Sequence, residues 1–349
     1  MIKLAKKLLL ACTVGTLSTT AIADITVNGA GSTFAHPIIS SWSENYNQLT
    51  GVKLNYQAIG SGGGIRQIEE KTVDFGASDA PLAPERLEQQ GLVQFPIIIG
   101  GIVPVVNLPG IESDDLKLTG ELLADIYLGK IKQWNDDAIK AINPDLNLPA
   151  FPIIVVHRSD GSGTTFNFTH YLGLVSQEWT DTVGVNTDVA WPRQATTIGG
   201  KGNAGVANFV ARTRGAIGYV ELAYAKQNNM THTMLQNKEG EFVSPDLNSF
   251  SKAAANADWV NTPTLDILLN DQPGAESWPM TAATFVLMHE EQANAESAKA
   301  ILDFFKWSFG ETGADTALAL DYIPMPDDVV EIIEGVWSER FQSNGKVIY

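Results

Sequence analysis

The chain has 349 residues, of which 44% are hydrophobic, and a formal net charge of −17 at pH 7. This length fits one large or two smaller folded units, and the acidic excess excludes nucleic acid and anionic membrane surfaces as partners. No apolar run in the sequence approaches the roughly 20 residues that span a bilayer as a helix.

The first 23 residues have the organisation of a secretory signal peptide. Basic residues open the segment, Leu8–Leu17 is mostly apolar, and Ala21–Ala23 is a small-x-small pattern, so we expect export and cleavage after Ala23. An alternative is a lipoprotein cleavage box with Cys12 as the lipidated residue, but only about four apolar residues precede Cys12 where roughly seven or more are usual. Cys12 is the single cysteine, so cleavage after Ala23 would leave no thiol chemistry.

Beyond residue 23, short β-like and helix-like segments alternate, which predicts an α/β fold. Three expected strands, at 26–28, 53–57 and 153–156, are each followed by a glycine-rich loop and a helix-like run. The loops are Gly29–Phe34, Gly60–Gly64 and Asp160–Thr165. A fourth expected strand, at 73–77, ends in Ser78 and Asp79. Because open α/β sheets bind ligands at the C-terminal ends of their strands, these segments predict one shared site.

Two further apolar strands, at 102–106 and 284–288, indicate where the chain passes between two lobes. We expect one lobe of residues 24–106 plus 280–349, a second lobe of residues 107–279, and a cleft between them with a hinge at the crossing strands. Pro104 has no N–H group, which predicts a sheet edge or a bulge at that position.

The three loops share one chemistry. Glycine lets a ligand approach the backbone N–H groups closely, the serine and threonine residues add hydroxyl donors, and each loop opens a helix. A helix N-terminus carries about half a positive charge and several unpaired N–H groups. Three such loops predict a site that surrounds a small oxyanion with neutral donors.

Arg158 follows an expected buried strand and lies two residues before the start of the third loop at Asp160. Its guanidinium offers a planar fork that matches two oxygens of a tetrahedral anion. The alternative is an arginine that only pairs with a carboxylate, and Asp160 is a nearby candidate for such a pair or for a capping role.

Asp79 bears on the identity of the anion. An ionised carboxylate only accepts hydrogen bonds, so it favours a ligand that carries a proton. Phosphate carries one at neutral pH and sulfate does not, which would let Asp79 discriminate between them. The alternative is an aspartate that caps a helix or turn before Pro81, and the spacing alone leaves both interpretations open.

Other motifs do not support catalysis or metal binding. The segment Gly199–Asn203 lacks the spacing of a P-loop, and we interpret it as a turn and helix start without direct ligand contact. The five histidines have no metal-ligand spacing, and no nucleophile elbow is present. We therefore expect no catalytic residues, no metal and no cofactor.

Together these motifs resemble the periplasmic phosphate-binding proteins of ABC-type phosphate importers, which are two-lobe solute-binding proteins with a type II-like fold. The resemblance covers essentially the whole chain after residue 23. Besides the three loops it includes Val73–Leu82, Asp125–Ile131 and Gly215–Lys226. It differs at Gly62, where a second serine is common, and at His157, where another basic residue is common.

The resemblance implies a periplasmic, monomeric receptor that binds inorganic phosphate with high affinity and delivers it to a membrane permease. The phosphate-binding residues that it implies are Thr33, Phe34, Ser61, Asp79, Arg158, Ser162, Gly163 and Thr164. It also favours the binding role of Asp79 over the capping role. The alternatives are an exported phosphatase-like enzyme and a binder of another tetrahedral oxyanion such as sulfate or molybdate.

Overall fold

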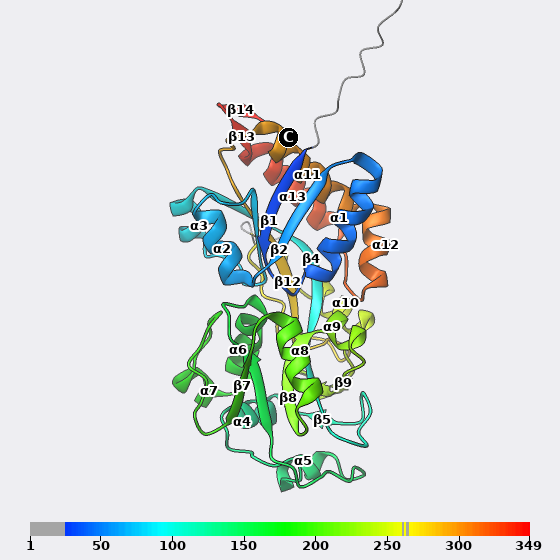
Figure 1. Cartoon of the computed structure of the whole chain (residues 1–349). Helices are drawn as coiled ribbons and strands as arrows, with labels where there is room; N and C mark the ends of the chain where they lie inside the picture. Colours follow the sequence, from blue (N-terminus) through cyan, green and yellow to red (C-terminus); the bar gives the residue numbers. More distant parts are fainter. Residues whose placement is uncertain (1–24, 260–261, 263–264) are drawn as a thin grey trace, which may run out of the picture.

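The structure is a computed structural model that describes residues 25–259, 262 and 265–349. The predicted signal peptide, with Cys12 and the expected cleavage after Ala23, lies outside these residues. Figure 1 shows two lobes, one above the other, joined where strands run through the middle of the molecule. The expected two-lobe α/β fold is confirmed.

The upper lobe in Figure 1 is built on three parallel strands and an antiparallel one. The strands are β1 (Thr26–Gly31), β2 (Lys53–Ala58), β3 (Phe75–Ser78) and β12 (Thr281–His289), with a terminal hairpin of β13 (Gln342–Ser343) and β14 (Lys346–Val347). The helices are α1 (His36–Thr50), α2 (Ser61–Glu69), α3 (Pro84–Gln90), α11 (Ala295–Phe309), α12 (Glu311–Ala319) and α13 (Asp327–Arg340).

The lower lobe repeats the strand-then-helix order on a second group of parallel strands. Its strands are β6 (Ile154–Arg158), β7 (Thr196–Gly200), β8 (Ala216–Glu221), β9 (Thr231–His232) and a small sheet of β5 (Lys117–Leu118), β10 (Met234–Gln236) and β11 (Phe242–Val243). Its helices are α4 (Gly120–Tyr127), α5 (Asp137–Ile142), α6 (Gly163–Val175), α7 (Gln177–Thr182), α8 (Gly202–Arg212) and α9 (Leu222–Gln227), and α10 (Leu247–Ala255) packs near the crossing.

The strand β4 (Leu92–Val106) connects the two lobes, and all fifteen of its residues are buried. It pairs with β12 from Leu92 to Gly101 and with β8 from Ile102 to Val106. One sheet with the order β2-β1-β3-β12-β4-β8-β6-β7 therefore runs through both lobes. The carboxyl ends of β1, β3 and β6 meet near the middle of the molecule, which positions the loops that follow them.

The expectation for Pro104 is met in part: β4 is a central strand without a bulge at this position, but Pro104 lies in the gap between its ladders with β12 and β9. Pro104 pairs with Tyr219 of β8 on one side, and on the other side its carbonyl accepts a hydrogen bond of 3.1 Å from the N–H of Thr233. The register shift in the β4–β12 ladder lies farther along, between Thr284 and Phe285. The proline is accommodated because β12 stops pairing at Gly101 and β9 starts pairing only at Val105.

The helix α1 shows how the local sequence specifies the packing. Its apolar residues recur at helical spacing, and one face buries Ile38, Ile39, Trp42 and Tyr46. Burial of a large apolar side chain stabilises the fold by roughly 1.5–3 kcal/mol. Packing of this face directs the N-terminus of α1 toward the lobe junction.

Candidate anion-binding site

The structure brings all eight predicted site residues to the junction of the two lobes. The loop between β1 and α1 supplies Thr33 and Phe34, α2 begins at Ser61, and α6 begins at Gly163. All eight are buried, and the most exposed, Thr33, retains only 6% of its accessible surface. Asp79 directly follows β3, and Arg158 is the last residue of β6.

The lobes touch through polar contacts beside the eight predicted site residues. The N–H of Gly62 donates to the carbonyl of Gly161 at 2.9 Å, and Asn167 Nδ2 donates to the carbonyl of Asp79 at 2.6 Å. A side chain at Gly163 would bring its Cβ within 2.6 Å of Ser61 Oγ and 2.7 Å of Asp79 Cβ. The structure is therefore a closed form in which backbone meets backbone across the junction.

Three hydroxyl groups in the site accept a hydrogen bond from a protein N–H group and donate none within the described part of the chain. They are those of Thr33, Ser162 and Thr164. A hydroxyl has one proton to donate and two lone pairs. Because the protein occupies only the acceptor side, each of these protons is available to a ligand oxygen. The hydroxyl of Ser61 accepts from the N–H of Asp79 at 3.2 Å and interacts with the Asp79 carboxyl.

The backbone adds donors beside these hydroxyls. The residue before α2 is Gly60, whose φ of 90° and ψ of 153° suit glycine, and no side chain caps this helix. The N–H groups of Gly62, Gly63 and Gly64 are bound to the carbonyls of Gly161 and Gly60. The first N–H of α2, that of Ser61, is therefore the one left without an acceptor among the described residues, as are the first two N–H groups of α6. These helix ends and the hydroxyls make the site suitable for an anion.

Asp79 provides an acceptor among these donors. Its Oδ1 accepts hydrogen bonds from Ser32 Oγ and from Thr284 Oγ1, the latter at 2.7 Å. No donor of the described residues reaches its Oδ2, although the side chain is only 2% exposed. The capping alternative is wrong, because Ala83, not Asp79, precedes α3 as its N-cap. The arrangement leaves one carboxylate oxygen for a proton that a ligand brings.

Burial dominates the ionisation of Asp79. Desolvation raises the pKa of its carboxyl to about 6, while the hydrogen bonds from Ser32, Thr284 and Ser61 and the charge of Arg158 lower it. Near neutral pH the carboxylate form is therefore available as an acceptor.

This shift predicts a pH dependence of stability in the ligand-free protein. Between the ordinary pKa of 3.8 and the folded value of about 6, the folded protein keeps a proton that the unfolded chain has released. Stability therefore falls as pH rises through this window, and the difference of about 2 units corresponds to roughly 3 kcal/mol. We expect the free energy of unfolding of Asp79→Asn minus that of the wild type, both measured with denaturant, to increase by roughly 3 kcal/mol between pH 4 and pH 7. A difference independent of pH would contradict the assignment.

Arg158 is held by Asp160 in a two-pronged ion pair. Nε lies 2.8 Å from Asp160 Oδ1 and Nη2 lies 2.6 Å from Oδ2, while Nη1 donates to Thr164 Oγ1 at 3.3 Å. Asp160 also accepts from the N–H of Gly202 at 2.9 Å, and the N-cap of α6 is Ser162. Both roles considered for Asp160 are observed: it pairs with Arg158 and fixes the guanidinium in the site, and its Oδ1 accepts from the first N–H of α8.

Two residues that contact the predicted site residues, Asn203 and Thr284, were not predicted. Asn203 at the start of α8 donates from Nδ2 to Thr33 Oγ1 at 2.9 Å and to Thr164 Oγ1 at 3.3 Å, so it links the hydroxyls of both lobes. The glycine-rich segment Gly199–Asn203 was the available signal for Asn203. On sequence alone this segment is interpreted as a turn and helix start without direct ligand contact. Thr284 had no signal, because it lies 205 positions from Asp79 within an apolar strand.

The tightness of the junction predicts a large effect of one methyl group. In Gly163→Ala, the new Cβ would meet Ser61 and Asp79 across the junction, so we expect the lobes to remain apart and ligand affinity to fall more than tenfold. Small-angle scattering would report the separation and calorimetry the affinity. Gly335→Ala in α13 is the matched control, because nothing lies within 4 Å of its Cβ. Normal closure of Gly163→Ala would contradict this account.

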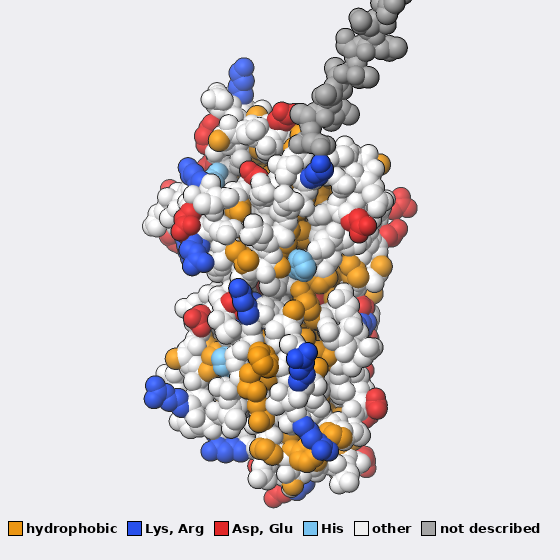
Figure 2. Space-filling model, in the orientation of Figure 1, with side chains coloured by type: hydrophobic (Ala, Val, Ile, Leu, Met, Phe, Trp, Pro, Cys, Tyr) orange, Lys and Arg blue, Asp and Glu red, His pale blue; other side chains and the backbone are white. Residues whose placement is uncertain are grey.

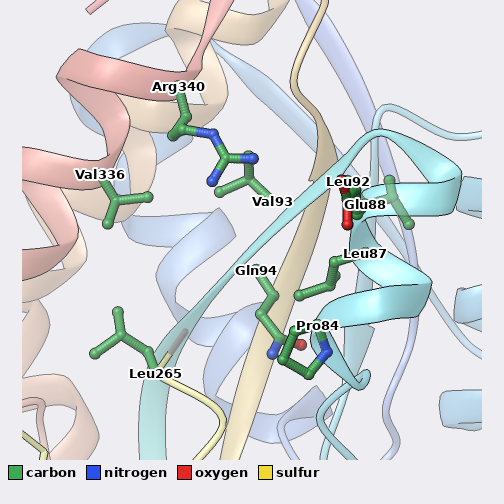
Figure 3. A pocket seen from close by; sticks show the side chains of 9 residues that line it. All are labelled: Pro84, Leu87, Glu88, Leu92, Val93, Gln94, Leu265, Val336 and Arg340. Carbon is green, nitrogen blue, oxygen red and sulfur yellow. The ribbon is translucent and has the colours of Figure 1, made fainter. Parts of the chain in front are cut away.

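Other parts of the surface are distinct from this site. The pocket in Figure 3, of about 310 Å³, contains no predicted site residue. It is lined by Pro84, Leu87, Glu88, Leu92, Val93, Gln94, Leu265, Val336 and Arg340. On the face shown in Figure 2, lysine and arginine side chains are scattered over both lobes among acidic ones. The described residues contain no helix long and apolar enough to cross a membrane and no group of three potential metal ligands among His, Cys, Asp and Glu.

Comparison with known proteins shows relatives along nearly the whole chain. Residues 14–312 match the PBP superfamily domain. The chain is 54% identical over 318 residues to the phosphate-binding protein PstS of Xylella fastidiosa strain 9a5c, covering 91% of this chain and 86% of the relative. It is 51% identical over 337 residues to PstS of Haemophilus influenzae, covering 97% and 99%.

Solved structures show the same fold. A high-affinity periplasmic phosphate-binding protein bound with phosphate, PfluDING, aligns with a TM-score of 0.73 at 21% identity over 92% of this chain and 96% of that one. A putative phosphate ABC transporter substrate-binding protein from Clostridium perfringens with bound phosphate aligns with a TM-score of 0.63 at 20% identity over 86% and 100%.

Proposed function

The chain belongs to the PBP superfamily and, within it, to the PstS phosphate-binding proteins, and from this we propose that it binds inorganic phosphate and delivers it to the permease of an ABC-type phosphate importer. It is a solute-binding protein and not an enzyme, in keeping with the binding proteins that it resembles. The phosphate would lie at the lobe junction against the eight predicted residues Thr33, Phe34, Ser61, Asp79, Arg158, Ser162, Gly163 and Thr164.

One observation carries this proposal. Among the described residues, the site combines three hydroxyl protons without a protein acceptor, those of Thr33, Ser162 and Thr164, with one buried carboxylate oxygen, Asp79 Oδ2, without a hydrogen-bond donor. A monoprotonated phosphate matches both, because its charged oxygens accept from the hydroxyls and from Arg158 while its own O–H donates to Asp79. Sulfate has no proton at neutral pH, and its oxygen would face the carboxylate directly.

Closure of the lobes couples binding to transport in this proposal. The donors of the first two loops belong to the upper lobe and those of the third loop to the lower lobe, so a ligand touches both sets only in the closed form. Binding therefore shifts the population toward closure. We propose that the lobes comprise residues 24–106 with 280–349 and residues 107–279, with the hinge in the crossing strands.

The remaining parts of the proposal concern location and partners. We propose that the mature protein begins at Asp24 after removal of the signal peptide, acts as a monomer in the periplasm, and docks its closed form on the permease. Two similar solved structures support export and partnership with a transporter, because one is of a periplasmic phosphate-binding protein and the other is of a putative phosphate ABC transporter substrate-binding protein. No cofactor, metal or nucleic acid is needed for this role.

Titration calorimetry tests the proposal directly. Purified mature protein would be stripped of ligand by unfolding and refolding, and then titrated with phosphate and separately with sulfate at neutral pH. We expect one-to-one phosphate binding and no sulfate heat. Equal binding of both anions would keep a receptor but remove the role of Asp79, and binding of neither would overturn the proposed function.

A further inference from the structure

A buried acidic residue lies at the point where the chain crosses between the lobes. Glu221 is the last residue of β8 and pairs with Ile102 of β4. The ladder between β4 and β12 ends one residue earlier, at Gly101. Its side chain has no exposed surface. A carboxylate in such a place is costly unless it is neutral or fully paired.

The contacts of Glu221 join the two lobes. Its Oε2 accepts a hydrogen bond of 2.8 Å from the N–H of Ala223 and lies 2.9 Å from the hydroxyl oxygen of Tyr322, which belongs to the upper lobe. The same hydroxyl lies 2.6 Å from the carbonyl oxygen of Phe34. Glu221 Oε1 is buried without a hydrogen-bond partner among the described residues.

The number of protons decides the ionisation state of this cluster. A carbonyl oxygen can only accept, so the single proton of the Tyr322 hydroxyl lies toward Phe34 at the shorter distance. The contact between Tyr322 and Glu221 Oε2 then has a proton only if Glu221 supplies it. An ionised Glu221 would leave two oxygens facing each other without a proton, or leave Phe34 without its donor, and would bury a charged Oε1 without a partner.

The groups around Glu221 agree with a neutral acid. Burial raises the pKa of Glu221 well above its ordinary value, and the negative charge of Asp321 raises it further, against the backbone N–H groups of Ala223 and Tyr224 and the contact with the Tyr322 hydroxyl, which lower it. Tyr224 faces the cluster as a neutral phenol, since burial raises its pKa as well. The ammonium group of Lys226 is bound to Asp321 at 2.6 Å.

The same segment also orients the first loop. Tyr224 donates to the carbonyl of Thr33 at 2.8 Å, and Asn203, whose Oδ1 accepts from the N–H of Glu221 at 2.9 Å, holds the Thr33 hydroxyl. A trans peptide is planar, so fixing the carbonyl of Thr33 also fixes the direction of the N–H of Phe34. The hydrogen bond between the Tyr322 hydroxyl and the carbonyl of Phe34 likewise fixes the direction of the N–H of Ala35.

We propose that Glu221 is a positioning residue that stays a neutral carboxylic acid and donates its proton to Tyr322, which in turn holds the Phe34 carbonyl and thereby orients the first phosphate-binding loop from the lower lobe. This inference rests on the proposed function, which supplies phosphate as the ligand. The protonation state of Glu221 does not depend on a ligand.

The first test reads the proton itself. Infrared spectra of the wild type and of Glu221→Gln at pH 8, where Asp79 is ionised, are expected to differ by a protonated-carboxyl C=O stretching band that is present only in the wild type. Absence of this band from the difference spectrum would overturn the proposal, whatever the protein binds.

The second test reads the positioning role. In Tyr322→Phe the ring packing stays and the proton chain is lost, so we expect the dissociation constant for phosphate to rise roughly threefold to tenfold and the double variant with Glu221→Gln to add little to it. Tyr127→Phe is the matched control, because the buried Tyr127 hydroxyl has no partner among the described residues. If the wild type binds phosphate and the affinity of Tyr322→Phe equals that of Tyr127→Phe, this inference is wrong. If the wild type binds no phosphate, the proposed function fails, and the infrared test still decides the state of Glu221.

Discussion

Replacement of Asp79 by asparagine is expected to reduce the preference for phosphate over sulfate by roughly 10- to 100-fold. The estimate follows from about 1–3 kcal/mol for a buried charged acceptor left without a partner. Ser32 and Thr284 both donate to Oδ1, so an asparagine would keep its oxygen there. Its Nδ2 would then occupy the position of Oδ2 and donate to either anion.

Competition calorimetry at pH 7.5 measures this change as a ratio of two dissociation constants. Sulfate binding should become detectable, while phosphate loses the bond from its own proton. Asp315→Asn, at an exposed position of α12, controls for the loss of one negative charge. An unchanged ratio in Asp79→Asn would show that another group distinguishes the two anions.

Replacement of Arg158 by alanine is expected to weaken phosphate binding at least 100-fold. The guanidinium is 3% exposed and is oriented by both oxygens of Asp160, and charge-assisted hydrogen bonds are about twice as strong as neutral ones. Its removal would also leave the carboxylate of Asp160 in the site without a counter-charge. Breaking a buried ion pair in this way costs about 3–5 kcal/mol of stability.

Two further variants separate charge from geometry. Arg158→Lys keeps the charge and loses the planar fork, so its phosphate affinity should lie between those of the wild type and Arg158→Ala. Arg214→Ala removes an arginine that stacks on Phe151 away from the site, and it should bind phosphate normally. Calorimetry gives the affinities and thermal unfolding gives the stabilities. Near-normal binding by Arg158→Ala would make this arginine purely structural.

Local patterns were sufficient for the elements that carry the site. The helical spacing of Ile38, Ile39, Trp42 and Tyr46 correctly predicted the buried face of α1. The three glycine-rich segments lie at the C-terminal ends of strands, as predicted, but they are shorter as loops than predicted. Gly29–Gly31 ends β1, and Ser61–Gly64 and Gly163–Thr165 are the first turns of α2 and α6. These features depend on neighbours within a few residues, so the chain encodes them locally. That the eight residues contact phosphate stays a prediction.

Some alternatives could be decided only by contacts between distant segments. The spacing around Asp79 allowed a cap as well as a ligand contact, and the hydroxyl of Thr284 from another strand settles where its Oδ1 points. The tolerance of Pro104 depends on where β12 and β9 pair with β4, which the sequence of β4 itself does not contain.

By itself the sequence determined the α/β alternation, the anion-binding character of the loops and the family, because glycine conformations, helix ends and motif spacing are local properties of the chain. Only the tertiary structure decided which hydroxyls have protons available, which oxygen of Asp79 is unpaired and why Glu221 is neutral. Those properties depend on how many donors and acceptors meet in one buried volume, and the members of that volume come from segments up to 288 positions apart.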